Sequence, residues 1–229
     1  MNINTKKIVN SLFRKLGYQI TRYCPTPYLA IPDDFDEDDR KLWYAAAPYT
    51  YTTPERVHSL ARAVEYVIAK KIPGDFVECG VWKGGSALAM ALTLVKLGDT
   101  TRHIYLYDTF DEGWPSGTEE DVTADGRKAH DLWREAVAKG ETTDTLFAKI
   151  EDVRTLMHST GYPMDKIHLI KGKVEDTIPS QAPSDISLLR LDTDWYESTK
   201  HELNELYPRL AKSGVLIIDD YSFFKGSKK

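Results

Sequence analysis

Residues 75–86, DFVECGVWKGGS, decide the fold, because a short apolar strand here leads into a glycine-containing loop and the apolar helix pattern of residues 85–97 follows. Four more short apolar runs are typical of strands: residues 103–108, 167–171, 185–191 and 214–219. Helical spacing of apolar residues predicts further helices over residues 127–139, 145–159 and 196–211. The alternation predicts an α/β fold: a doubly wound, Rossmann-like, mostly parallel sheet with helices on both faces.

The chain ahead of this pattern is organised differently. We expect residues 1–52 to form a separate N-terminal segment that includes a helix, and residues 53–229 to form the Rossmann-like domain. Residues 8–16 have the apolar spacing of an amphipathic helix, but the rest of the first 50 residues is expected to be irregular. We expect the amphipathic helix to pack on its own domain or on a second subunit of a homo-oligomer, with binding to a membrane surface as the alternative. Thr53 followed by Pro54 predicts the start of the next helix.

Composition excludes some classes of protein. The 229 residues carry 30 basic and 35 acidic side chains, a net charge of −5, so a nucleic-acid partner is not expected. Cys24 and Cys79 are the only cysteines, too few for a disulfide framework, and fit a reducing compartment. The sequence has no apolar run long enough to cross a bilayer and no secretory signal at its start. The expected location is therefore the cytoplasm.

Acidic residues end four of the five predicted strands: Glu78, Asp108, Asp192 and the pair Asp219–Asp220. In open α/β sheets, ligands bind at the carboxyl ends of the strands, where the strand order reverses. Carboxylates are rarely buried unless they are paired or bind a metal ion. We therefore expect these side chains to form one site, and the alternative is that each merely caps a turn or a helix.

The glycine loop indicates the kind of cofactor. A dinucleotide fingerprint aligned on Gly80 needs glycine at position 82, where Trp82 stands, and the sequence contains no P-loop. The expected ligand thus has a ribose but no pyrophosphate. Asp108 is suited to accept hydrogen bonds from ribose hydroxyls, and Glu78 to face a cationic amine or sulfonium. S-adenosylmethionine meets these conditions.

The motifs DFVECGVWKGGSALAMALTL, IYLYDTF, KGKVEDTIP, LRLDTDWYESTKHELNELYPRL and GVLIIDDY resemble the macrocin O-methyltransferase (TylF-type) family over residues 48–225. Its members are class I S-adenosylmethionine-dependent, metal-dependent methyltransferases. The resemblance implies methyl transfer to a hydroxyl of a small molecule, a sugar or a sugar-bearing natural product or polysaccharide building block. It also implies a closing C-terminal hairpin, and we expect either that this hairpin is truncated here or that the sheet is closed differently.

The resemblance further assigns roles to individual residues. It implies Asp192, Asp219 and Asp220 as metal ligands and Asp194 as the general base, with both Asp192 and Asp194 catalytic. If their segment is extended, both side chains face the same edge of the sheet. The implied metal is Mg²⁺, since carboxylates without Cys or His ligands favour a hard cation. The implied cofactor contacts are Glu78, Gly80, Ser86, Asp108, Val174 and Glu175, and the implied lid and acceptor contacts are Tyr49 and Thr50.

Two other functions remain as alternatives. A catechol-type O-methyltransferase usually has lysine three positions after the first metal-binding aspartate, where this chain has Trp195. A non-catalytic binding protein of the same fold is expected to have lost one of the four aspartates, and all four are present. Trp195 is suited equally to the core and to an acceptor pocket. Of the histidines, His130 and His158 are the two that we consider for the site.

Overall fold

The computed structural model describes residues 31–113, 117–123, 126–138, 147–219 and 221. Its centre is a five-stranded sheet with the order β3-β2-β1-β4-β5, and every neighbouring pair of strands is parallel. The strands are β1 (Asp75–Cys79), β2 (Ile104–Asp108), β3 (Ile167–Lys171), β4 (Ile186–Leu191) and β5 (Leu210–Ile218). The chain builds outward from β1 to β3 and then returns to β4, so the strand order reverses between β1 and β4. The α/β, doubly wound prediction is confirmed.

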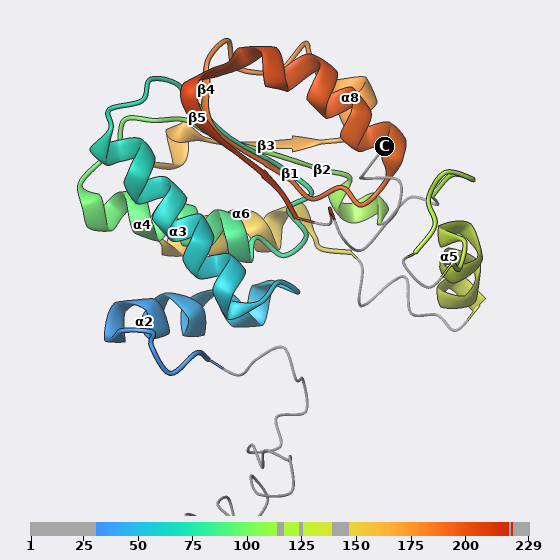
Figure 1. Ribbon diagram of the computed structural model, residues 1–229, viewed down its shortest axis with the longest axis horizontal. Coiled ribbons are helices and arrows are strands. Elements are labelled where there is room, and N and C mark those ends of the chain that lie inside the picture. Colours follow the sequence, from blue (N-terminus) through green and yellow to red (C-terminus); the bar gives the residue numbers. More distant parts are fainter. Residues whose placement is uncertain (1–30, 114–116, 124–125, 139–146, 220, 222–229) are drawn as a thin grey trace, which may run out of the picture.

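Helices cover both faces of the sheet (Figure 1). One face carries α3 (Pro54–Ala69), α4 (Gly85–Leu97) and α6 (Ile150–Ser159), with α2 (Glu37–Ala46) packed outside them. The other face carries α8 (Tyr196–Leu206) and the short α7 (Val174–Thr177). The helix α5 (Ala129–Ala138) lies to one side of the sheet in Figure 1. Short 3₁₀ turns complete the described elements: η2 (Ala47–Tyr49), η3 (Phe110–Glu112), η4 (Met164–Lys166) and η5 (Tyr207–Arg209).

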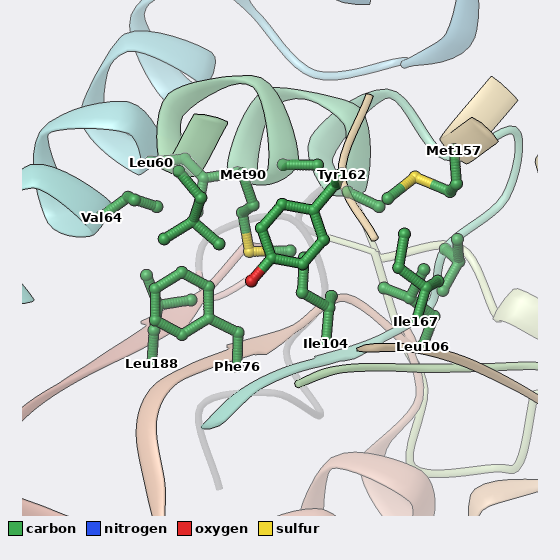
Figure 2. Packing of buried hydrophobic residues seen from close by; sticks show 14 of the residues in the cluster. Leu60, Val64, Phe76, Met90, Ile104, Leu106, Met157, Tyr162, Ile167 and Leu188 are labelled. Atoms are coloured by element: carbon green, nitrogen blue, oxygen red, sulfur yellow. The ribbon is translucent and has the colours of Figure 1, made fainter. Parts of the chain in front are cut away.

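Alternate residues of each strand enter two separate cores, as the two-residue period of a strand requires. Phe76 and Leu188 pack with Met90 of α4 and Leu60 of α3 on one face (Figure 2). Val77 and Leu189 pack on the opposite face beneath α8. Side chains at positions 78 and 190 therefore belong to the face covered by α3 and α4.

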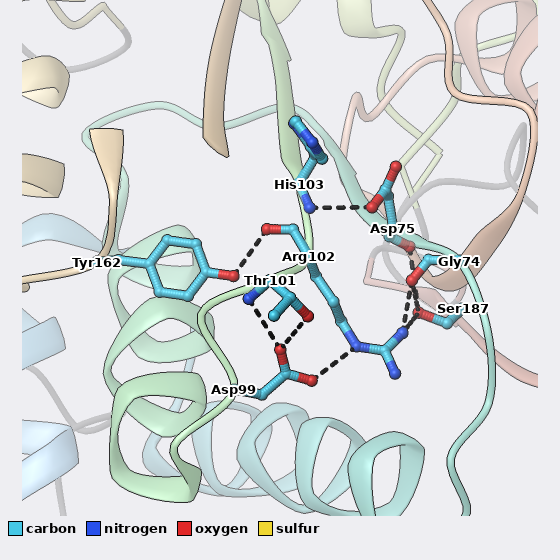
Figure 3. A network of polar contacts seen from close by, with 8 residues as sticks. All are labelled: Gly74, Asp75, Asp99, Thr101, Arg102, His103, Tyr162 and Ser187. Carbon is cyan, nitrogen blue, oxygen red and sulfur yellow. Dashed lines mark hydrogen bonds and ion pairs between the residues drawn. The ribbon is translucent and has the colours of Figure 1, made fainter. Parts of the chain in front are cut away.

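The amino ends of the strands are tied together by polar contacts around Arg102 (Figure 3). Its guanidinium donates to the Gly74 carbonyl, to Ser187 Oγ at 2.9 Å and to Asp99 at 3.2 Å. The Tyr162 hydroxyl donates to the Arg102 carbonyl at 2.7 Å. These contacts link the amino ends of β1, β2 and β4, at the opposite end of the strands from the carboxyl ends, where ligands of open α/β sheets bind.

The structure confirms several predicted elements and corrects others. The helix at residues 85–97 is confirmed, as is the helix that begins at Pro54 with Thr53 as its N-cap. The helix predicted over residues 196–211 ends at Leu206, because Pro208 cannot continue it, and β5 begins at Leu210 rather than at residue 214. The helix predicted to begin at residue 145 begins at Ile150.

The N-terminal part of the described chain contains a helix that we did not predict. Asp36 caps α2 by accepting a hydrogen bond from the Asp39 N–H at 2.8 Å. Acidic residues in the first turn of a helix are stabilised by its dipole, so the acidic residues at 36–39 form a helix start, whereas residues 33–35 are a turn and loop ahead of it. The amphipathic helix expected at residues 8–16 and the hairpin expected near the C-terminus lie outside the described residues. No helix in the described ranges is long and apolar enough to span a membrane.

Candidate active site

A cavity of about 940 Å³ lies at the carboxyl ends of the strands, where their order reverses. It brings together most of the predicted site residues: Tyr49, Thr50, Gly80, Ser86, Asp108, Val174, Glu175, Asp192, Asp194 and Asp219. Two predicted residues are not in this lining. Glu78 is fully buried beneath the cavity, and Asp220 is outside the described residues. The prediction that the strand-end carboxylates lie at one edge thus holds for the described aspartates.

Gly80 allows the first loop to approach β4. Its φ is +84°, and a Cβ added there would lie 2.1 Å from the carbonyl oxygen of Asp192. The N–H of Asp192 donates to the Cys79 carbonyl at 2.8 Å, and that of Asp219 to the Leu191 carbonyl at 2.9 Å. Both aspartates therefore follow the last hydrogen bonds of the sheet, and Asp192 lies directly beside the glycine loop.

Asp108 holds the glycine loop in place. Its carboxylate accepts backbone N–H bonds from Val81 at 2.7 Å, from Trp82 at 2.8 Å and from Phe110 at 2.6 Å. Burial nevertheless raises the pKa of Asp108, against the effect of these bonds. The residue predicted to bind ribose therefore also joins the ends of β1 and β2 in the structure.

Trp82 occupies the position at which a dinucleotide site needs glycine. Its φ of +47° is in the left-handed region, its ring stacks on Tyr51 with centroids 4.0 Å apart, and the Lys83 ammonium lies 4.5 Å from the ring centroid. The indole Nε1 is buried and has no hydrogen-bond partner among the described residues. A bulky ring thus fills the place where pyrophosphate meets the backbone in dinucleotide sites.

The predicted lid residues rest on the start of α4. A Cβ added to Gly85 would lie 2.7 Å from both the Tyr49 carbonyl oxygen and the Thr50 Cβ. A side chain larger than hydrogen at position 85 would push the segment away. Gly85 therefore lets residues 49–50 form one wall of the cavity.

Asp194 lies at the centre of a tight turn. The N–H of Trp195 donates to the Thr193 carbonyl at 2.7 Å, and Asp194 has a φ of +66°. This γ-turn is a rare and strained conformation, of the sort that persists where the surrounding structure enforces it and that is frequent at functional sites. The expectation of an extended Asp192–Asp194 segment is therefore wrong, although both side chains line the cavity.

Two arginines that the sequence reading missed lie among the aspartates. Arg190 in β4, with 4% of its side chain exposed, pairs with Glu78 at 2.7 Å, with Asp192 at 2.9 Å and with Asp219 at 3.2 Å. Arg56 of α3 pairs with the other oxygen of Asp219 at 2.8 Å. Burial raises the pKa of Glu78 to about 7, and its pairing with Arg190 opposes the rise. Arg190 could have been identified from the sequence, because it is a charged residue inside the otherwise apolar strand predicted at residues 185–191.

The insertion between β2 and β3 supports the site from outside. Asp121 is fully buried and accepts a hydrogen bond from the Tyr196 N–H at 2.7 Å, which caps α8. Trp195 packs against Ala129 and also lines the cavity, so it serves both of the roles considered for it. His130 and His158 are not among the residues that line the cavity.

The parallel sheet, the reversal of strand order at a glycine loop and the carboxylates around one cavity are typical of a Rossmann-like enzyme that binds a nucleoside-containing cofactor. The family model for macrocin O-methyltransferase (TylF) matches residues 18–229. The chain therefore belongs to the macrocin O-methyltransferase family, and it is an O-methyltransferase that uses S-adenosylmethionine.

Relatives of known activity support this membership. The chain is 34% identical over 225 residues to the 8-demethyl-8-(2,3-dimethoxy-alpha-L-rhamnosyl)-tetracenomycin-C 4'-O-methyltransferase of Streptomyces olivaceus, covering 97% of this chain and 79% of that protein. It is 31% identical to the demethyldecarbamoylnovobiocin O-methyltransferase of Streptomyces niveus, over 78% of this chain and 64% of the relative. The solved structure of the O-methyltransferase NovP matches with a TM-score of 0.67 at 29% identity, covering 79% of this chain and 70% of NovP.

Proposed function

We propose that this protein transfers the methyl group of S-adenosylmethionine to a hydroxyl of a sugar, free or attached to a larger natural product, with Mg²⁺ holding that hydroxyl. One observation carries the proposal: the cofactor-side residues Gly80 and Asp108 and the acceptor-side residues Asp192 and Asp194 line the same cavity. Its volume of about 940 Å³ is at the upper end of the range for sites of drug-sized ligands, which fits a cofactor together with an acceptor.

The cofactor is assigned to the side of the cavity formed by β1, β2 and α7. Asp108, at the end of β2, would accept hydrogen bonds from the ribose, while Val174 and Glu175 at the start of α7 would flank the adenine. The buried indole N–H of Trp82, which has no partner in the described chain, is a donor suited to a polar group of the ligand. These residues would orient the methyl group toward β4.

Asp194 is the proposed general base, which accepts the proton of the acceptor hydroxyl. Its position at the centre of a strained γ-turn, beside a cavity, is typical of a functional side chain. A sugar hydroxyl is a weak nucleophile, so a positioned proton acceptor would raise the rate by about 10²- to 10⁴-fold. Asp192, two residues earlier, would hold the hydroxyl in place rather than take its proton.

The residues present fit a hard divalent cation in part. Oxygens of Asp192 and Asp219 lie 2.9 and 3.2 Å from the same nitrogen of Arg190, so the two carboxylates converge. The third predicted ligand, Asp220, is not described, and the described ranges hold no group of three or more His, Cys, Asp or Glu side chains arranged for a metal. Arg56, whose side chain is 47% exposed, would have to leave Asp219. When bound, Mg²⁺ would lower the cost of negative charge on the hydroxyl oxygen.

The sugar acceptor is inferred from the relatives. The Streptomyces olivaceus relative is named for a rhamnosyl tetracenomycin, and a relative from Micromonospora griseorubida, 30% identical over 78% of this chain, is a mycinamicin III 3''-O-methyltransferase. The exposed Tyr51 ring at the rim of the cavity would give a flat apolar surface to a sugar ring.

The test is an acceptor panel with S-adenosylmethionine labelled with ¹³C in its methyl group. Rhamnosides, amino-sugar glycosides and catechol are each incubated with the protein and Mg²⁺, and products are identified by mass spectrometry and NMR. We expect a labelled methyl ether on a sugar oxygen, formed about 10²-fold more slowly, or slower still, by Asp194→Asn. A label on catechol alone would show a phenolic acceptor in place of the sugar. Binding of S-adenosylmethionine without methyl transfer to any of these acceptors would contradict the proposed transfer to a sugar hydroxyl.

A further inference from the structure

A set of charged side chains takes the place of the apolar core at the carboxyl end of one sheet face. Phe76 and Leu188 are apolar on this face, and two positions later each strand has a charged residue, Glu78 or Arg190. The two stand opposite each other in the register of β1 and β4. Glu78 and Arg190 are almost fully buried, at 1% and 4% side-chain exposure. Such a pair needs further partners to offset the loss of hydration.

Arg190 finds these partners in the two predicted metal ligands. Its Nη1 bonds Glu78 Oε1 at 2.7 Å, while its Nη2 lies 2.9 Å from Asp192 Oδ2 and 3.2 Å from Asp219 Oδ1. One arm of the guanidinium is thus fixed by β1, and the other binds one oxygen from each aspartate. Without the positive charge of Arg190, the carboxylates of Asp192 and Asp219 would repel each other at short range.

We infer that Arg190, oriented by Glu78, is a positioning residue that gathers Asp192 and Asp219 into a site for a divalent cation. The inference rests on the proposed function, since it explains how the acceptor side is built. Once Arg56 has left Asp219, the side chains of Asp192, Asp219 and Arg190 carry a net charge of −1, which a divalent cation would offset. Glu78, predicted from sequence as a cofactor contact, acts on this view through Arg190 and not on the ligand.

This arrangement of three carboxylates requires the planar guanidinium of an arginine. The guanidinium presents donors in two fixed directions and can therefore bond Glu78 on one side and the aspartates on the other, whereas a lysine ammonium is a single point of charge on a flexible stem. Arg56 differs from Arg190 in this respect, because its side chain is half exposed and contacts Asp219 alone among the three acids. Arg190 is the fixed cation of the site, and Arg56 the exchangeable one.

The experiment measures Mn²⁺ binding to the purified full chain by electron paramagnetic resonance and S-adenosylmethionine binding by calorimetry. The main variant is the double substitution Glu78→Leu with Arg190→Met, because replacing both partners of a buried ion pair by apolar side chains of similar volume is often neutral for stability. We expect Mn²⁺ binding about 10-fold or more weaker, as for other residues that orient metal ligands, with cofactor affinity close to that of wild type.

Two single variants complete the test. Glu78→Gln keeps an oxygen for Arg190 to bond and should bind Mn²⁺ nearly as well as wild type. Arg190→Lys keeps the charge but loses the second arm, and should bind Mn²⁺ weakly. Equal Mn²⁺ binding by wild type, the double variant and Arg190→Lys would overturn the inference alone. No Mn²⁺ binding by wild type would overturn the metal of the proposed function, and this inference with it.

Discussion

Substitution of Gly80 by alanine tests the close approach of the glycine loop to β4. Gly80 has a φ of +84°, and an added Cβ would lie 2.1 Å from the Asp192 carbonyl oxygen and 2.6 Å from its carbon. Gly98, at the end of α4, is the matched control, because its φ is +72° but nothing lies within 4 Å of an added Cβ. Comparison of the two variants separates the cost of a left-handed backbone at alanine, which both have, from the cost of the steric clash, which only Gly80→Ala has.

The expected magnitudes follow from these geometries. Alanine in a left-handed conformation costs about 1–2 kcal/mol, and both variants should lose this amount of unfolding free energy. Gly80→Ala must also displace backbone atoms of Asp192, and overpacking of this kind typically costs a further ~1–3 kcal/mol. The clash moves Asp192 itself, so Gly80→Ala should also lose turnover, whereas Gly98→Ala should keep it.

Urea unfolding followed by circular dichroism measures the two free energies, and methyl transfer is measured on the same samples. The expected order of stability is wild type, then Gly98→Ala, then Gly80→Ala. If Gly80→Ala unfolds at the same urea concentration as Gly98→Ala and retains turnover, β1 and β4 do not approach as described, and the site at their junction would be wrong.

Three further outcomes are expected. Asp194→Asn should lower kcat by about 10²-fold or more while Mn²⁺ and cofactor affinities stay near normal, and an unchanged kcat would remove Asp194 as the base. Asp108→Ala should weaken S-adenosylmethionine binding in calorimetry, since it removes a predicted ribose contact and the anchor of the glycine loop; wild-type affinity would contradict this. Burial raises the pKa of Glu202, a fully buried residue of α8, from 4.5 to about 8, so the folded protein holds a proton that the unfolded chain releases. Its contribution to stability should therefore fall as the pH rises from about 5 to 8, by about 1.4 kcal/mol per pH unit, and urea titrations of Glu202→Gln should lack this slope.

The sequence predicted those features that depend on local patterns. The helix at residues 85–97 follows directly from the glycine loop and a continuous apolar run, and its bounds were predicted to the residue. The placement of Asp108, Asp192 and Asp219 at one edge follows from parallel strands ending in acids. Local turn signals also located the start of α3 at Pro54.

Features that depend on contacts between distant segments were not predicted. The Glu78–Arg190 pair depends on the register of two strands whose residues are 112 positions apart, and the cap of α8 by Asp121 joins residues 75 positions apart. The turn at Asp194 was missed because a left-handed aspartate is uncommon and has no local signal. The end of α8 could have been predicted from Pro208, which was included in the helix in spite of its missing N–H.

The most direct test of metal-assisted methyl transfer is one time course of product formation with ¹³C-methyl S-adenosylmethionine and a rhamnosyl acceptor. EDTA is added midway, and excess Mg²⁺ is added later. We predict that the sugar methyl ether accumulates, stops accumulating when EDTA is present and resumes with Mg²⁺, while Asp219→Ala forms none throughout. Accumulation that continues at the same rate in EDTA would contradict the role given to Asp192 and Asp219.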